Sequence, residues 1–409
     1  MPCRYFTRHF SGHANIIFEF SFACHLALLS FYSVGPIRRG SDTGGYVMSG
    51  NDREIQWINT LKGACILLVI LHHLMLTSFI PSLGIIGEES ALGQWWLTLN
   101  AHLTPLRMPS FFFISGLLAA SAVLRKTWRE VFTKRVVNLL YVYVLWCLIQ
   151  WALVSFINHY LSFDQWGVKN MVGTSYADSL NQFVVYSLTA MANTWYLYAL
   201  AIYFVVCKLF KNNMLSLLLL GVAANYVAAR GLLPGWGPNS VAQNALYFCV
   251  GCFYGRQVVE FLQHRRHVLG VLLVALPLAL LHAHFGMNKS IFHCAIAIVL
   301  CVVICREVNA RMTPNSLNWL GKNTLQVYVI HKIVTEVIAV CVVGALVHYH
   351  AFESWSFSAV WLLAFPFVGV ALSVCLSLGI WRLINRGVGR ALFQYPGMIK
   401  PVPALAKLP

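Results

Sequence analysis

Charged residues are scarce in this chain. Asp, Glu, Lys and Arg together make up 10% of its 409 residues, whereas hydrophobic residues make up 59% and the mean hydropathy is +0.68. A soluble domain needs a charged surface, so this composition excludes an ordinary soluble protein and predicts a polytopic membrane protein. Acidic residues are especially few, at 13 against 29 Lys and Arg, and the formal net charge is +16.

The excess of basic residues does not predict a nucleic-acid partner. Most of the Lys and Arg residues lie in short gaps between long apolar segments. Membrane proteins concentrate basic residues in their cytoplasmic loops, which explains this distribution without nucleic acid. We therefore expect the lipid bilayer as a partner of this chain and no nucleic acid.

The chain also lacks a paired cysteine framework. Eight of its twelve cysteines are scattered through apolar segments, namely Cys65, Cys147, Cys207, Cys249, Cys294, Cys301, Cys341 and Cys375. Such residues are typically small buried thiols. Cys249 and Cys252 are close in sequence, but no second pair and no nearby His accompanies them. We expect neither disulfides nor a metal site.

The sequence shows no soluble domain, internal repeat or low-complexity block. Residues 1–47 differ from the rest, because they combine several Arg residues, an interrupted apolar stretch and a Gly/Ser-rich joint without the clean core of a signal peptide. We interpret them as a leader translated upstream of a natural start at Met48, or alternatively as an extra weak transmembrane or interfacial helix. A transmembrane domain over 48–390 and a cytoplasmic tail over 391–409 are expected to follow.

Ten apolar segments after Met48 have about the length needed to cross a bilayer as a helix. They cover residues 58–79, 103–124, 136–158, 192–210, 213–230, 241–260, 267–285, 288–305, 322–346 and 358–383. If the chain from Met48 begins in the cytoplasm, eighteen Lys and Arg residues fall in cytoplasmic gaps and the tail, and only Lys169, Arg230 and Lys289 fall on the other side. One miscounted helix would destroy this bias. The predicted fold is an all-α integral membrane bundle of about ten transmembrane helices, with both the N-terminus (from Met48) and the C-terminus cytoplasmic.

Two of the predicted external stretches are long and contain aromatic residues. These stretches are 80–102 and 159–191, and their aromatic residues include Trp95, Trp96, Trp166 and Tyr176. Aromatic residues at such positions most often anchor a membrane protein at the bilayer interface. Stacking on a sugar or a lipid head group is the alternative interpretation.

The first predicted span carries ionisable residues, which are costly in hydrocarbon. Lys62 lies near its start, and His72 and His73 lie further in. Eleven residues of helix leave Lys62 and His73 about 20° apart around the axis and about 16 Å apart along it, so they share a face. His72 points about 80° away from Lys62, so His73 is the histidine expected to act with the lysine. A snorkelling lysine and a structural histidine are the alternative.

The second predicted span begins with Arg107 between two prolines, Pro105 and Pro109. An arginine at the outer side of the membrane can bind a carboxylate, a phosphate or a developing oxyanion. It can also face lipid head groups. Further along, Ser115 and Gly116 are small residues, and we expect them to allow close helix packing rather than to supply a nucleophile.

Five stretches of the sequence together resemble the membrane-bound acyltransferase 3 family of bacterial inner-membrane proteins. They are residues 62–73, residues 107–116, the pair Lys134 and Arg135, residues 194–200 and residues 320–331. The resemblance covers about residues 53–390 in the same order and is greatest to a largely uncharacterised subgroup. The leader and the 159–191 stretch lie outside it.

The resemblance implies transfer of an acyl group, commonly acetyl, to a hydroxyl of an envelope glycan, polyol or lipid-linked sugar. It implies acetyl-CoA or another acyl-CoA as cytoplasmic co-substrate, a carbohydrate or lipid-linked sugar acceptor, and the bacterial inner (plasma) membrane as location. The family pattern of a basic residue, ten residues and a histidine corresponds to Lys62 and His73. Many members have Arg in place of Lys62, and Lys keeps the charge without the bidentate geometry.

The same resemblance suggests roles for the ionisable residues. His73 becomes the candidate general base for the acceptor hydroxyl, or a transient acyl carrier. Arg107 would stabilise the oxyanion or orient the acceptor, and Lys62 and Arg135 would attract the phosphates of CoA. His331, in the ninth span, either completes the catalytic site or makes a structural hydrogen bond between helices.

Two other classes of function compete with this interpretation. In a transporter or exporter, Lys62, His73, Arg107 and His331 would form a substrate or proton relay. Transporters often show repeat symmetry and paired broken helices, and the sequence shows neither. The third alternative is a catalytically silent scaffold, which the intact pairing of Lys62 with His73 disfavours.

Overall fold

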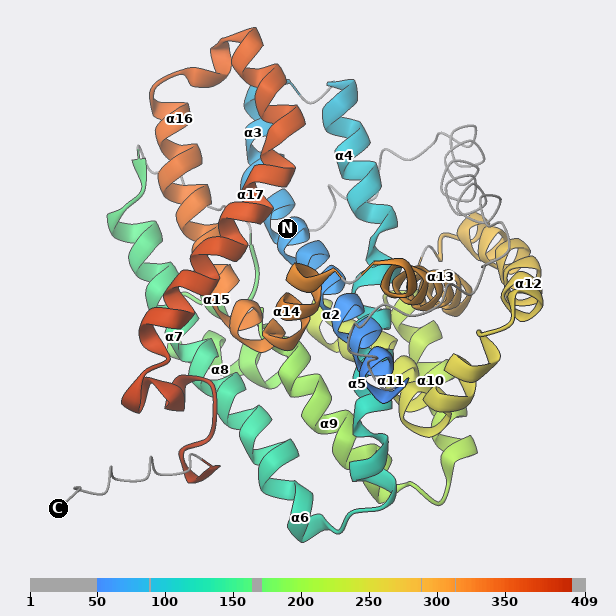
Figure 1. The fold of residues 1–409 in the computed structure, drawn as a ribbon. Coiled ribbons are helices and arrows are strands. Elements are labelled where there is room, and N and C mark those ends of the chain that lie inside the picture. Colours follow the sequence, from blue (N-terminus) through green and yellow to red (C-terminus); the bar gives the residue numbers. More distant parts are fainter. Residues whose placement is uncertain (1–49, 88–89, 164–170, 288, 313, 399–409) are drawn as a thin grey trace, which may run out of the picture. The chain divides into compact units, whose positions relative to one another are not determined.

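The computed structural model describes residues 50–87, 90–163, 171–287, 289–312 and 314–398 (Figure 1). The predicted leader, the predicted start at Met48, Trp166 and residues 399–409 of the predicted tail lie outside the described residues.

Every regular element in the described ranges is a helix, so the all-α prediction is confirmed there. This is the structure expected for segments in hydrocarbon, since a helix satisfies its own backbone hydrogen bonds. The elements are α2 (Gly50–Leu74), η1 (Met75–Phe79), α3 (Ile80–Ile86), α4 (Ala91–His102), α5 (Thr104–Leu124), α6 (Trp128–Phe132), η2 (Thr133–Val137), α7 (Asn138–Tyr160), η4 (Thr174–Tyr176), α8 (Leu180–Leu188), α9 (Trp195–Leu209), α10 (Met214–Ala229), α11 (Trp236–Phe261), α12 (Arg265–His284), α13 (Ile291–Arg311), α14 (Asn315–Lys322), α15 (Thr324–Val337), η5 (Ile338–Val343), α16 (Gly344–His348), η6 (Ala351–Glu353), α17 (Trp355–Ile384), η7 (Gly387–Leu392) and η8 (Pro396–Met398).

Seven helical stretches in the described part of the chain are long and apolar enough to cross a membrane. They are Gln56–Ile86, Ala91–Leu124, Trp128–Tyr160, Arg265–His284, Ile291–Arg311, Thr324–His348 and Trp355–Ile384. The apolar helices α9 and α10 are shorter, and α11 is long but carries Asn239, Gln243 and Asn244 near its start. A helix therefore occupies each of the ten predicted segments, and seven of these helices have the length and composition of a span.

The stretch over residues 80–102, which was predicted to be external, is largely helical. Residues 80–86 continue the first span as α3, and α4 over Ala91–His102 leads into the second. The N-cap Ser90 accepts a hydrogen bond from the Gly93 backbone, which starts α4 near the end of α3. Trp96 is only 5% exposed and packs edge-on against Phe367 of α17, so it stabilises helix packing rather than an interface.

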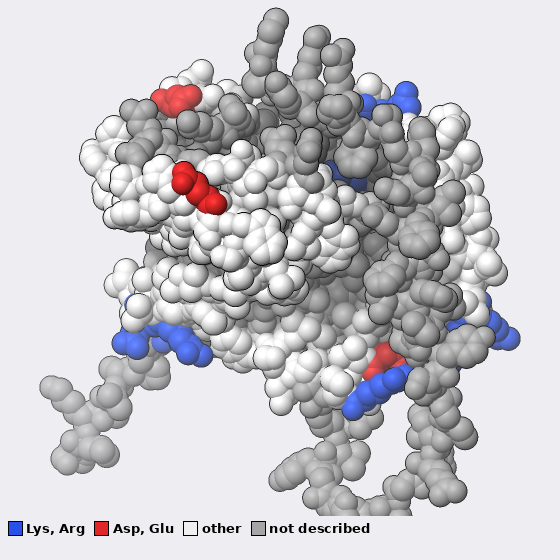
Figure 2. Space-filling model, turned by 90° about the horizontal axis from the view of Figure 1, so that it is seen from above, with Lys and Arg blue, Asp and Glu red and all other residues white. Residues whose placement is uncertain are grey.

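Helix α2 lies at the centre of the bundle, where it packs against α5, α13, α14, α15 and α17 (Figure 1). A central helix exposes little of its surface to lipid, so its polar residues can contact protein on several sides. Viewed from above, most of the described surface is uncharged, and the Lys and Arg residues lie mainly toward its margin (Figure 2). Lys62, His72 and His73 of α2 are thus partly buried in an apolar bundle.

Glycines allow two pairs of helices to approach closely. A Cβ on Gly116 of α5 would lie 2.1 Å from the Phe248 carbonyl oxygen of α11, and one on Gly321 of α14 would lie 1.8 Å from the Asn59 carbonyl oxygen of α2. Only a residue without a side chain fits such contacts. The expected packing role of Gly116 is confirmed, and Gly321 has the same role.

Replacing Gly321 with alanine is expected to destabilise the protein. The new methyl group meets a backbone oxygen, which moves only if α14 or α2 shifts, and such overpacking typically costs about 1–3 kcal/mol. The measurement is thermal unfolding of the purified protein in detergent. Gly270→Ala in α12 is the matched control, because its Cβ meets nothing within 4 Å and alanine favours a helix. Equal midpoints for Gly321→Ala and the wild type would contradict the close contact.

The first part of the predicted tail packs against α7. The Leu392 carbonyl accepts a 2.6 Å hydrogen bond from Trp146 Nε1, and Phe393 lies against the same ring. The Tyr395 backbone donates to Asn138 Oδ1 at 2.8 Å. Residues 391–398 are therefore part of the folded bundle.

Candidate active site

Lys62 and His73 both lie on the side of α2 that faces α15. Lys62 lines a cavity together with Tyr328 of α15. The ring of His73 lies 5.1 Å, centroid to centroid, from the ring of His331, which is also on α15. The period of an α-helix brings residues eleven positions apart onto one face, so the predicted shared face is confirmed.

The neighbouring imidazoles of His73 and His331 present buried nitrogen atoms without partners. His331 Nδ1 lies 2.6 Å from the Tyr328 carbonyl oxygen, so this nitrogen carries the proton and Nε2 is left as an acceptor. His331 Nε2 and His73 Nδ1 have no hydrogen-bond partner among the described residues. Two adjacent imidazoles arranged in this way can hold or accept a proton from a substrate.

His72 points to a different neighbour, the helix α4. Its Nδ1 lies 3.4 Å from Asn100 Nδ2, and Asn100 Oδ1 accepts a 2.6 Å hydrogen bond from Arg107 Nη1. Arg107 Nη2 also donates to Thr104 Oγ1 at 2.5 Å. The structure thus places His72 beside Asn100, which binds Arg107, and places His73 beside His331.

Arg107 is 3% exposed, so it does not face lipid head groups as the alternative interpretation required. Its contacts with Asn100 and Thr104 are to neutral groups, and they engage three of the five guanidinium N–H groups. In the described part of the chain, the side-chain hydrogen bonds of Arg107 go to Asn100 and Thr104 and not to the His73–His331 pair. A role for Arg107 at an oxyanion therefore stays a prediction.

A cavity of about 320 Å³ brings together the residues predicted to bind CoA. Lys62 of α2 and Arg135 of the π-helical turn η2 both line it, and Lys134 adds a third cation. None of the described lining residues is acidic. Three cations without an acidic neighbour favour an anionic ligand such as a phosphate.

Hydroxyl groups form another part of the wall of this cavity. They belong to Ser115, Tyr196, Thr324 and Tyr328. Ser115 Oγ contacts the Tyr196 hydroxyl and donates to the Phe111 carbonyl, so it is held in a helix-packing arrangement. The Tyr328 ring lies 5.9 Å from the His331 ring, and its hydroxyl donates to the Asn193 carbonyl at 2.7 Å. Tyr328 therefore lines the cavity and also neighbours His331.

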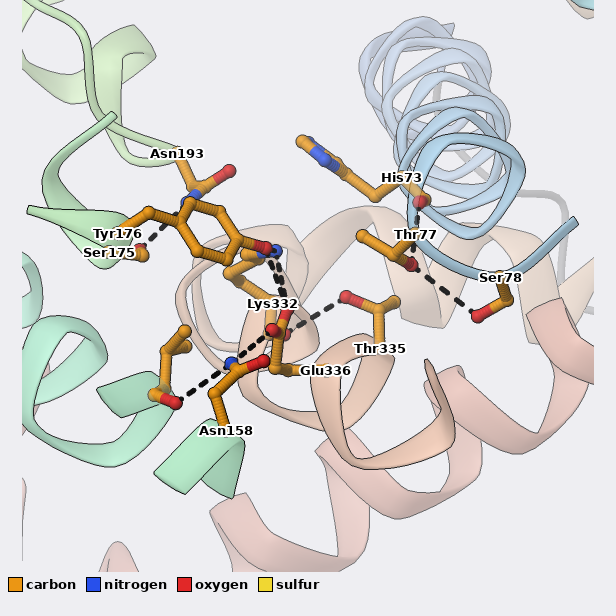
Figure 3. Close-up of polar contacts among 11 residues, drawn as sticks. His73, Thr77, Ser78, Asn158, Ser175, Tyr176, Asn193, Lys332, Thr335 and Glu336 are labelled. Carbon is orange, nitrogen blue, oxygen red and sulfur yellow. Dashed lines mark hydrogen bonds and ion pairs between the residues drawn. The ribbon is translucent and has the colours of Figure 1, made fainter. Parts of the chain in front are cut away.

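A buried ion pair lies next to His331 in the sequence (Figure 3). Lys332 and Glu336 are one turn apart on α15, both 0% exposed, with Nζ and Oε2 2.9 Å apart. The Tyr176 hydroxyl donates to Glu336 Oε2 at 2.7 Å and accepts from Lys332 Nζ. Asn158 Nδ2 of α7 donates to Glu336 Oε1 at 2.6 Å. Every charge in the cluster is thus paired, as burial requires.

Lys332 directly follows His331 in the sequence, but its partners were not predicted. Glu336 lies four residues after Lys332, the spacing of a helical ion pair, and that spacing could have revealed it. Tyr176 was expected at the membrane interface, but it packs in the protein with Lys332 Nζ 4.7 Å from its ring centroid. Burial and the Glu336 carboxylate raise the pKa of this phenol, which lies in the connection between α7 and α9, so it keeps its proton.

The ten described cysteines are free, and eight of them are buried. Cys207 Sγ and Cys249 Sγ lie 3.5 Å apart without being bonded. In the described ranges, no group of three or more His, Cys, Asp or Glu side chains has the arrangement of a metal site. The absence of a metal stays a prediction for the chain as a whole.

Comparison with known proteins places this helical bundle, with ionisable side chains at its centre, among membrane acyltransferases. A family model described as an acyltransferase domain matches residues 55–382. The chain belongs to the acyltransferase 3 family, and the predicted resemblance is confirmed. No solved structure matches it.

Among individual relatives, the chain is similar to the inner membrane protein YcfT of Escherichia coli. The two are 32% identical over 356 residues, which cover 84% of this chain and 96% of that protein. It is also similar to the nodulation protein NolL of Sinorhizobium fredii, with 26% identity over 57% of this chain and 56% of the relative. The NolL of Mesorhizobium japonicum is 24% identical over 54% of this chain and 53% of the relative.

Proposed function

We propose that this protein transfers an acyl group, acetyl in the simplest case, from cytoplasmic acyl-CoA to a hydroxyl of an envelope glycan, polyol or lipid-linked sugar. The observation that carries the proposal is a cavity lined by three cations that reaches Tyr328, beside which the His73–His331 pair lies. This arrangement places a site for an anion near a pair of histidines that can act as a base. The acyltransferase domain supports the reaction class.

On the donor side, Lys62, Lys134 and Arg135 would bind the phosphates of CoA. Lys62 and His73 lie eleven residues apart on one face of α2, or about 16 Å along a helix. An extended phosphopantetheine arm is about as long. Phosphates held at the cations would therefore allow the thioester to reach the histidines.

In the chemical step, the acceptor hydroxyl oxygen attacks the thioester carbonyl carbon while an imidazole takes its proton. The tetrahedral intermediate collapses as the carbon–sulfur bond breaks, and CoA leaves as a thiol with a proton returned by the imidazolium. His331 donates through Nδ1 to the Tyr328 carbonyl, so its Nε2 is available to accept a proton beside His73. Alternatively, His73 carries the acyl group transiently between CoA and the acceptor.

We further propose that the ten helical segments all cross the bacterial inner membrane, with the described chain beginning and ending on the cytoplasmic side. The predicted bias of Lys and Arg supports this orientation. Lys208, at the end of α9, donates to the Val123 and Lys126 carbonyls at the end of α5, so these two helix ends lie on one side. Similarity to an inner membrane protein supports the location.

The proposed function is tested with radiolabelled acetyl-CoA. Purified protein in detergent is incubated with the label and an envelope-glycan extract, and the glycan fraction is counted. Label in the glycan supports the proposal. No transfer, together with movement of a solute by vesicles that contain the protein, would instead support a transporter.

Replacing Lys62 or Arg135 with methionine is expected to weaken acetyl-CoA binding by about tenfold or more, because a charge-assisted hydrogen bond contributes about 1.5–3 kcal/mol. Isothermal titration gives the dissociation constant. Arg129→Met, an exposed residue of α6 that does not line the cavity, should bind acetyl-CoA like the wild type. If all three variants bind equally, the cavity is not the CoA site.

A further inference from the structure

A second hollow, here called the α7 groove, lies at the far end of α7 from Arg135. Its volume is about 890 Å³, and it is formed by the last turns of α7 and the segment 171–178. Seven of its twelve described lining residues have polar side chains, namely Ser155, Asn158, His159, Tyr160, Ser175, Tyr176 and Asp178. A surface that merely faces lipid tails does not collect hydrogen-bonding groups in this way.

The wall of the α7 groove is held in place by the rest of the protein. Trp151 Nε1 donates to the Ala177 carbonyl at 2.8 Å, and Asn193 Nδ2 donates to Ser175 Oγ at 3.0 Å. Trp236 Nε1 donates to the Val172 carbonyl at 2.8 Å. Such fixed walls reduce the ordering cost of binding a ligand.

The charges of the α7 groove differ from those of the CoA cavity. Its described lining residues include the carboxylate of Asp178 and neither Lys nor Arg, whereas three cations line the cavity. An anionic ligand would therefore find no cation among these residues. Amide, hydroxyl and imidazole groups beside the exposed rings of Phe156 and Tyr160 suit a neutral polyhydroxylated ligand, since they pair with its hydroxyls and stack on its C–H face.

The α7 groove extends toward the proposed catalytic pair through Tyr176. This residue lines the groove and contacts both Lys332 and Glu336. Lys332 directly follows His331 on α15. In Figure 3, the Tyr176 hydroxyl points to Lys332 and Glu336. Tyr176 thus links the groove to the turn of α15 that follows His331.

We propose that the α7 groove binds the carbohydrate part of the acceptor and that its ligand is a neutral sugar rather than an anionic head group. This inference rests on the proposed function. Tyr176 and Asn158 form the floor of the binding site. The groove, rather than the CoA cavity, determines which acceptor is used.

Ser155→Trp is expected to fill the groove without disturbing the buried ion pair, because Ser155 is exposed and makes none of its contacts. With a neutral-glycan fraction of the envelope extract as acceptor, KM for the glycan should rise by at least about tenfold, which equals about 1.4 kcal/mol of binding. KM for acetyl-CoA should not change. Leu148→Trp, exposed on α7 outside the groove, is the matched control. A glycan KM within about twofold of wild type for Ser155→Trp would overturn the proposal.

A second readout does not depend on activity. A photo-crosslinking p-benzoylphenylalanine replaces Ser155 or, as control, Leu148 in the full-length protein in cells, and the captured molecules are identified by mass spectrometry. Capture of neutral carbohydrate at position 155 but not at 148 supports the proposal. Phospholipid alone at both positions overturns it. If no variant transfers acetyl while position 155 still captures carbohydrate, the proposed reaction fails and the groove assignment stands.

Discussion

Replacing His73 with alanine is expected to reduce acyl transfer by about 10²–10⁴-fold, the usual contribution of a general base. The imidazole of His73 has a buried ring nitrogen without a described partner and lies beside His331, so it is placed to accept a proton. Transfer of label from acetyl-CoA to the glycan fraction measures the effect. Acetyl-CoA binding should be retained, because the cations of the cavity are intact.

His72→Ala is the control for this variant. His72 is adjacent in sequence, but its ring lies beside Asn100 at 3.4 Å, a weak contact, so we expect a loss below about tenfold. Equal losses in the two variants, or full activity of His73→Ala, would overturn the role of His73. A label on His73 in a rapidly quenched reaction that hydroxylamine releases, as it releases an acylimidazole, would identify the acyl carrier mechanism rather than the general base.

Replacing Lys332 with methionine is expected to lower the free energy of unfolding by about 3–5 kcal/mol, since it leaves a fully buried carboxylate on Glu336 without its cation. Tyr176 and Asn158 still donate to that carboxylate but cannot neutralise it. The loss is measured by reversible unfolding in mixed micelles, or as a lower thermal midpoint in detergent.

The double variant Lys332→Met with Glu336→Met should recover much of the lost stability, because it leaves no unpaired charge in the core. Arg256→Met gives the comparison with an exposed helical pair. Arg256 and Glu260 have the same i,i+4 spacing, but their side chains are 82% and 56% exposed, so the loss there should stay below about 0.5 kcal/mol. A single Lys332→Met variant as stable as Arg256→Met would show that the buried pair does not stabilise the fold.

Much of the candidate site could be predicted from local spacing. The shared face of Lys62 and His73, and the different direction of His72, follow from the helical period alone. The packing role of Gly116 follows from the small size of the residue in an apolar helix. Each of these properties belongs to one helix, so no knowledge of its neighbours is needed.

Properties that depend on two or more helices were predicted less well. Residues 80–102 were expected to form an external stretch, because a polar connection and a helix extended by a cap cannot be separated by hydropathy alone. The hydrogen bonds of Arg107 to Asn100 and Thr104 were not predicted, and its role at an oxyanion stays a prediction. Tyr176 was expected at the interface, but a partner 160 residues away holds it inside the protein.

The sequence by itself determined that this chain is an all-α membrane protein with a lysine and a histidine on one face of its first span, because apolar composition and helical period are properties of local segments. The tertiary structure alone decided that His73 meets His331, that Lys62 and Arg135 line one cavity, and that Lys332 is neutralised by Glu336 with Tyr176. These arrangements depend on which apolar faces pack together. Apolar faces look alike in sequence, so only the packing itself identifies the neighbours.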